Sequence, residues 1–166
     1  MRDGGHFLDA PRATMAHMKT LFDPADRNAL ETRIRSLGPE NQRLWGKMNA
    51  AQMLCHCQRP IETVVGDKPM KQAFIGKLIV PFIRKSIFSE KPFGKNAPTD
   101  PTFVVADERQ LDAERDQLLK LIDRMVERGP DPAGKATHSF FGKLSGAEWG
   151  ELMYKHIDHH LQQFGA

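Results

Sequence analysis

Three histidines near the C-terminus, His156, His159 and His160, lie within a run of five residues. In an α-helix, side chains four residues apart point in nearly the same direction, so His156 and His160 would share one face, about 40° apart. His159 would point roughly 100° away from His160. Two imidazoles at this spacing are able to bind one divalent metal ion. A third ligand from elsewhere in the chain would leave a coordination position open, as catalytic metal sites do.

His56 is the candidate for that third ligand. It shares a face with Met53 and Pro60 in a segment that we predict to be helical. In a bundle where this segment packs beside the C-terminal helix, His56 would face His156 and His160, which is how helix bundles build metal sites. Neutral imidazoles favour Zn²⁺, Ni²⁺ or Fe²⁺ over Mg²⁺ and Ca²⁺.

A structural role for the same histidines is the alternative interpretation. Single histidines are more often hydrogen-bonded core or surface residues than ligands. Positive side chains near a helix C-terminus are also favoured by the helix dipole. The spacing alone leaves both interpretations open.

The composition is that of one soluble globular domain, with 166 residues, 40% hydrophobic and 27% charged. The formal net charge of +3 comes from 24 Lys and Arg against 21 Asp and Glu, and the basic residues are scattered, so we expect no nucleic-acid partner. The longest apolar run, 74–88, is interrupted by charges and a proline, so we expect no membrane partner. The only cysteines, Cys55 and Cys57, form no disulfide framework, and we expect a cytoplasmic protein.

Hydrophobic periodicity separates a tail from a domain. Residues 1–18 show none, so we expect a disordered N-terminal extension followed by one helical domain over 19–166. Within that domain the patterns predict an all-α fold, with four main helices and a shorter helical insertion.

Signals for the ends of the first two helices are clear. The first opens at Asp23-Pro24, with Asp as the N-cap and Pro at the first helical position, and ends at Gly38-Pro39. The second opens at Asn49, whose capping box uses Gln52. Pro60 lies inside this helix and predicts a kink close to His56.

The remaining elements follow from similar signals. The third main helix is predicted over about 108–128, and the last opens at Ser145, with Glu148 completing a second capping box. The insertion over 70–88 is expected to form one or two apolar helical pieces, interrupted at Pro81. We expect loops over two further segments, 91–101 and 138–142.

Two segments resemble the DinB-like superfamily of helical-bundle metalloenzymes. They are 45–57, with the sequence WGKMNAAQMLCHC, and the histidine-bearing run 148–165. The loop segments 91–93 with 98–101, and 138–143, resemble an uncharacterised subfamily known only as a domain of unknown function. The resemblance covers roughly residues 19–165.

This resemblance implies a four-helix bundle of non-sequential topology that holds a metal ion, commonly nickel or zinc. Iron and manganese are further options for the three-histidine site. Carried over by position, the ligands are His56, His156 and His160, and His159 matches an adjacent histidine that is not a ligand. Characterised relatives include thiol-dependent S-transferases and a mycothiol-dependent isomerase. The fold and the ligands therefore transfer better than the reaction.

Three more residues are candidates for the pocket around the metal. Gln163, three residues beyond His160, is placed to hold the second ring nitrogen of that ligand, or is a solvated amide. Trp149, seven residues before His156, either walls the pocket or is a core tryptophan. His138 either lines the entrance or packs in the interior.

Weaker roles are assigned to a loop and to the cysteines. The loop with Lys91, Lys95 and Asn96 either meets an anionic substrate, such as a low-molecular-weight thiol with carboxylates, or carries solvated side chains. Cys55 and Cys57 point about 100° away from the intervening histidine, so we interpret them as small buried hydrophobic residues rather than ligands.

The sequence thus predicts a metal-dependent transferase or hydrolase acting on a small molecule, with a thiol or water at the metal as the reactive group and catalytic side chains unassigned. No glutamate lies beside the histidines as in His-Glu-x-x-His, which argues against a peptidase. The alternative is a non-catalytic helical binding or interaction module with a structural metal or none. In that alternative, segment 74–88 is a homodimer face or a pocket lid.

Overall fold

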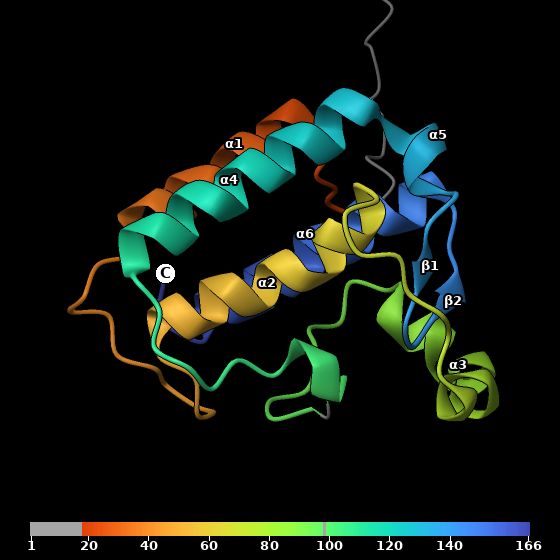
Figure 1. The fold of residues 1–166 in the computed structure, drawn as a ribbon, viewed down its shortest axis with the longest axis horizontal. Helices are drawn as coiled ribbons and strands as arrows, with labels where there is room; N and C mark the ends of the chain where they lie inside the picture. The colour runs from red at the N-terminus through yellow and green to blue at the C-terminus, as the bar shows by residue number, and fades with distance from the viewer. Residues whose placement is uncertain (1–17, 98) are drawn as a thin grey trace, which may run out of the picture.

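Four long helices surround the core of the protein in a computed structural model that describes residues 18–97 and 99–166. In Figure 1, two of them form an upper layer and two a lower layer: α1 (Pro24–Ser36) with α4 (Leu111–Arg128), and α2 (Ala50–Val64) with α6 (Gly146–Gln162). Helices α1 and α2 each pack against both α4 and α6. The order around the core is therefore α1, α4, α2, α6, which differs from the order along the chain. The all-α prediction is confirmed, whereas the predicted extension over residues 1–18 lies outside the described residues except for Met18, and it stays a prediction.

Each long helix contributes apolar side chains to one continuous core. These side chains recur at three- and four-residue spacing, which places them on the inner face of each helix. The largest of the completely buried side chains include Leu30, Ile34, Met53, Leu54, Ile61, Leu118, Leu121, Ile122, Met125 and Trp149.

The predicted helix starts are confirmed at three positions. Asp23 accepts hydrogen bonds from the N–H groups of the first turn of α1, beside Pro24. Reciprocal capping boxes join Asn49 to Gln52 at the start of α2, and Ser145 to Glu148 at the start of α6. Because these bonds satisfy backbone donors that the helix leaves unpaired, they fix where α2 and α6 begin and hence which residues face inward.

One of the two prolines inside helices has less effect than the sequence suggested. Helix α2 continues through Pro60 to Val64, and the kink remains a prediction. Helix α3 (Phe74–Ile87) runs through Pro81 as one helix, so the predicted interruption there is wrong. Pro81 is exposed, and so is Lys77, the residue whose carbonyl a proline at this position leaves without its helical partner.

The segment between α4 and α6 contains short regular structure, part of which falls on the predicted loop 138–142. Pro130–Ala133 forms helix α5, because Pro at the first helical position has the backbone angle that a helix needs. Strands β1 (Thr137–His138) and β2 (Gly142–Lys143) pair antiparallel, with His138 opposite Gly142. Helix α4 begins at Leu111, about three residues later than predicted.

The segment between α3 and α4 is mostly loop, as predicted, with one short 3₁₀ turn, η1 (Pro101–Phe103). Asp100 caps this turn by accepting a hydrogen bond from the N–H of Thr102. Among residues 18–97 and 99–166, no helix combines the length and apolar character that crossing a bilayer requires.

Candidate metal centre

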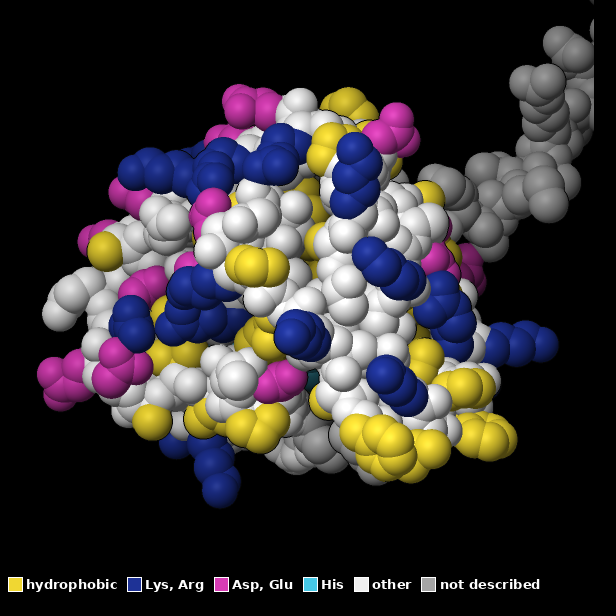
Figure 2. Space-filling model, turned by 45° about the vertical axis from the view of Figure 1, so that its right-hand side comes forward, with side chains coloured by type: hydrophobic (Ala, Val, Ile, Leu, Met, Phe, Trp, Pro, Cys, Tyr) yellow, Lys and Arg dark blue, Asp and Glu magenta, His cyan; other side chains and the backbone are white. Residues whose placement is uncertain are grey.

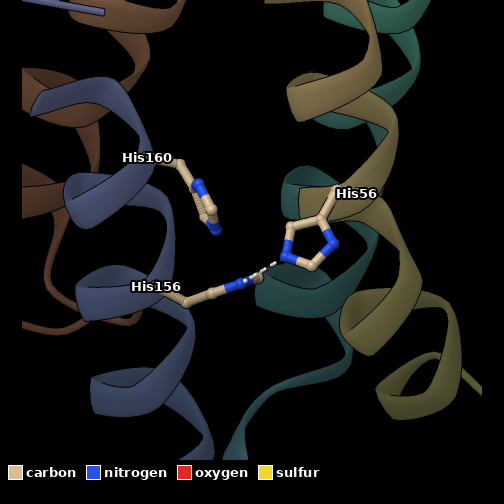
Figure 3. Close-up of side chains that lie close together, drawn as sticks. All are labelled: His56, His156 and His160. Atoms are coloured by element: carbon tan, nitrogen blue, oxygen red, sulfur yellow. Dashed lines mark hydrogen bonds between the residues drawn. The ribbon is translucent and has the colours of Figure 1, made fainter. Parts of the chain in front are cut away.

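The side chains of His56, His156 and His160 converge on one point between α2 and α6 (Figure 3). The Nε2 atoms of His56 and His156 lie 3.0 Å apart, and one ring nitrogen from each of the three lies within 4.8 Å of the others. With metal–nitrogen bonds of about 2.0–2.1 Å, two nitrogens on one ion are about 3 to 4 Å apart. Small rotations of the rings would therefore bring all three to a single ion.

The helices position these rings through their register. The capping box at Ser145 sets the start of α6, and His156 and His160 follow one turn apart on the face that meets α2. On α2, His56 is only 3% exposed, among core residues that include Met53. Helix α2 packs against α6 on one side and α4 on the other, and most of its residues are buried. The ring of His56 is therefore enclosed by protein.

A backbone carbonyl fixes the orientation of the first ring. Nδ1 of His56 lies 2.9 Å from the carbonyl oxygen of Phe103 in η1. Because a carbonyl only accepts hydrogen bonds, Nδ1 carries the proton and donates it. Nε2 of His56 is then unprotonated and presents a lone pair to the centre.

A side-chain amide fixes the ring of His160 in the same sense. Gln163 donates its Nε2–H to the carbonyl oxygen of Trp45 at 2.7 Å, so its Oε1 faces Nδ1 of His160, at 2.8 Å. Nδ1 of His160 must therefore be the donor, which leaves Nε2 with a lone pair. This is the role for which the sequence offered Gln163, and both neutral rings have the tautomer that binds a metal through Nε2.

The ring of His156 is held differently. Its Nδ1 is buried and has no hydrogen-bond partner among the described residues. Since Nε2 of His56 carries no proton, Nε2–H of His156 donates to it. This hydrogen bond would give way when a metal ion binds both nitrogens. The donor set therefore fits a divalent ion that prefers imidazole.

Burial keeps all three rings neutral. It lowers the pKa of His156 well below its usual value, helped by repulsion from the other histidines, and lowers the pKa of His160 to about 3. Burial also lowers the pKa of His56, although the hydrogen bond to Phe103 opposes this. Because metal ligands must be deprotonated, the rings are ready to bind near neutral pH.

The other two pocket candidates lie beside the trio rather than within it. Trp149 is completely buried, and its ring centroid is 5.3 Å from that of His138. His138 is also buried, and its Nδ1 accepts hydrogen bonds from the N–H groups of Phe140 and Phe141. Burial lowers the pKa of His138 to about 4. Of the two alternatives for each residue, these positions correspond to interior packing.

His159 lies outside the group of three, as its direction on the helix predicted. Its ring packs against Trp45 and Phe93, with centroids 5.7 and 5.8 Å away. Lys95 lies over the ring of Trp45, with Nζ 4.5 Å from the centroid. The loop that follows α3 therefore covers the C-terminal end of α6 on the side of His159.

Sequence reasoning missed the two backbone carbonyls that orient the ligands, those of Phe103 and Trp45. A carbonyl occurs in every residue, so no residue type marks this role. The one available signal was Asp100-Pro101, which begins the turn that presents Phe103. The cysteines are free and buried, as predicted, and burial raises the pKa of Cys55 and of Cys57.

A family model for a protein family of unknown function, DUF1569, matches residues 16–166. The chain belongs to the DUF1569 family. The match spans all the helices and the three histidines. No curated protein and no solved structure matches the chain.

Proposed function

We propose that this protein is a metal-dependent enzyme whose ion is bound by His56, His156 and His160. The convergence of three neutral imidazoles from two helices carries this proposal. It is supported by the two hydrogen bonds that leave Nε2 of His56 and of His160 unprotonated. The helix order around the core and the resemblance of segments 45–57 and 148–165 support membership in the DinB-like superfamily, which is part of the proposal.

Nickel or zinc is the proposed metal, with iron or manganese less favoured, because three neutral nitrogen ligands suit the borderline ions. A bound ion would act as a Lewis acid that lowers the pKa of a thiol or of water and so favours its attack on an electrophile. The protein residues supply orientation: Phe103 and Gln163 hold protons on Nδ1 of their histidine partners. Three protein ligands leave room for a substrate atom.

The proposed reaction class is thiol-dependent group transfer or hydrolysis of a small molecule in the cytoplasm. Lys95, which lies over the ring of Trp45 beside His159, offers a positive charge to an anionic substrate such as a low-molecular-weight thiol with carboxylates. Two buried, free cysteines accord with a reducing compartment. A screen of thiols paired with electrophiles, using metal-loaded protein, tests this part of the proposal.

Metal content tests the centre itself. Protein purified without a nickel column and loaded with Ni²⁺ or Zn²⁺ should bind one ion per chain, measured by mass spectrometry of the elements. His156→Ala should lose that ion while its helix content, measured by circular dichroism, changes little. His159→Ala is the matched control, because this neighbouring histidine lies outside the group, and it should retain the metal. Full retention of metal by His156→Ala would overturn the assignment.

The second candidate is a non-catalytic binding module whose metal is structural or absent. The exposed apolar side chains of α3 favour it, because they offer a surface for a partner. X-ray absorption separates the two functions. Three nitrogen ligands with an exchangeable water support chemistry, whereas a fourth protein ligand supports a structural ion.

A further inference from the structure

Helix α3 stands apart from the four long helices, at one corner of the molecule (Figure 1). Its inner side, with Gly76 and Val80, is buried against the rest of the chain. Its outer side carries three large apolar side chains that are mostly exposed: Phe74 at 76%, Leu78 at 54% and Phe82 at 85%. A folded protein gains nothing from this exposure unless something covers the surface.

The three exposed side chains form one continuous stripe. They are spaced at four residues, so they lie one above another along α3, about 40° apart. Figure 2 shows the hydrophobic side chains of this corner projecting from the molecule rather than lining a hollow. Projecting side chains are suited to insertion into a lipid bilayer. A surface that binds a side chain of a partner protein would instead need a pocket.

The helix is joined to the rest of the chain on its inner side. The N–H of Ala73 donates to the carbonyl of Ser139 at 2.7 Å, and Arg84 pairs with Glu148 of α6. Gly76 lies so close to the backbone of Phe140 that a Cβ there would overlap it. The outer stripe is therefore the free face of a docked helix.

The charged residues of α3 and of the segment before it are all basic. Residues 68–89 contain no Asp or Glu, and their five basic residues are Lys68, Lys71, Lys77, Arg84 and Lys85. Three of these cations, Lys71, Lys77 and Lys85, are exposed and form no ion pair with any described residue. Lys77 and Lys85 lie on the outer side of α3, beside the apolar stripe.

We propose that α3 is an interfacial helix that binds the surface of an anionic lipid bilayer. Phe74, Leu78 and Phe82 would enter the boundary between headgroups and acyl chains, and Lys77 and Lys85 would reach the anionic headgroups. Apolar burial and electrostatic attraction add in this arrangement.

A second copy of the chain is the competing occupant, as the predicted homodimer face. Two copies meeting through α3 would bring their unpaired lysines together, and like charges oppose that contact. An anionic surface pairs with the same lysines, so charge complementarity favours the lipid.

This inference goes beyond the sequence-based expectation of no membrane partner. That expectation rested on the absence of a long apolar run, which a spanning helix requires. A helix that lies on the surface needs only an apolar face and basic residues.

The test is flotation of the full chain with vesicles of phosphatidylcholine, with and without phosphatidylserine. The wild-type protein should float with the anionic vesicles, float less at high salt, and stay in solution with phosphatidylcholine alone. Phe82→Glu and Lys77→Glu should each weaken binding roughly tenfold or more, because one removes apolar burial and the other reverses a charge.

Two variants serve as matched controls. Leu44→Glu places the same carboxylate at another exposed apolar position, and Lys120→Glu reverses an exposed lysine on α4. Both should bind the anionic vesicles like the wild type. Equal losses in the controls, or a wild-type chain that never floats, would overturn the proposal. So would a wild-type dimer in sedimentation that Phe82→Glu converts to monomer without any vesicle binding, since a second copy would then occupy the stripe.

Discussion

Oε1 of Gln163 accepts a hydrogen bond from Nδ1 of His160 at 2.8 Å, and the two residues are three positions apart in the chain. The amide of Gln163 is itself fixed by the carbonyl of Trp45. The backbone of Gly46 allows this, because it has a positive φ of 79° and a Cβ at that position would overlap the Gln163 amide. Orientation of one candidate ligand thus depends on a loop more than a hundred residues earlier in the chain.

Gln163→Leu should weaken metal binding about 10- to 100-fold, because Nδ1 of His160 would lose the acceptor that fixes its proton and its ring. Competition with a chromophoric chelator measures the affinity. Gln162→Leu is the matched control: Gln162 is exposed and its amide donates to Asp158, away from the candidate ligands. Equal affinities in the wild type and Gln163→Leu would contradict the proposed role.

The stability of the metal-free protein should fall as the pH falls from about 6.5 towards 4. Burial lowers the pKa of His138 from 6.5 to about 4, so the unfolded chain takes up a proton that the folded protein excludes over this interval. At one pKa unit per 1.4 kcal/mol, His138 alone would remove about 3 kcal/mol of unfolding free energy. Above 6.5 its contribution is fully present, and below 4 the loss is complete.

Urea denaturation at a series of pH values, with a chelator present, measures this loss. His56, His156 and His160 act in the same direction, so the comparison with His138→Asn isolates the contribution of His138. Asparagine keeps an oxygen that can accept backbone N–H groups and does not titrate. Parallel pH profiles for the two proteins would show that His138 is not the titrating group.

The two cysteines should be inert in the folded protein. Both are buried, and burial raises the pKa of each thiol, so little thiolate forms and reagents cannot reach it. An aromatic disulfide reagent should label neither Cys55 nor Cys57 until the chain is unfolded. Ser86→Cys on exposed α3 is the positive control and should react at once. Rapid labelling of the native wild type would contradict the buried positions.

The sequence by itself determined the helices and the histidine face of α6. Asp23, Asn49 and Ser145 act on backbone donors within three residues, and His156 and His160 share a face because of the helical repeat alone. These are local relationships, so a pattern in the chain is enough to predict them. Pro81 shows the limit even there, because α3 continues through this exposed proline, against the local signal for a break.

Only the tertiary structure decided what lies around those histidines. His56 is a hundred residues from His156, and their approach follows from α2 and α6 packing side by side. The carbonyls of Phe103 and Trp45 orient His56 and Gln163, yet every residue has such a carbonyl. The sequence also could not show that the apolar stripe of α3 is exposed, because the same apolar spacing occurs in helices that are buried in a core. Which groups meet across the chain depends on packing, which residue spacing does not encode.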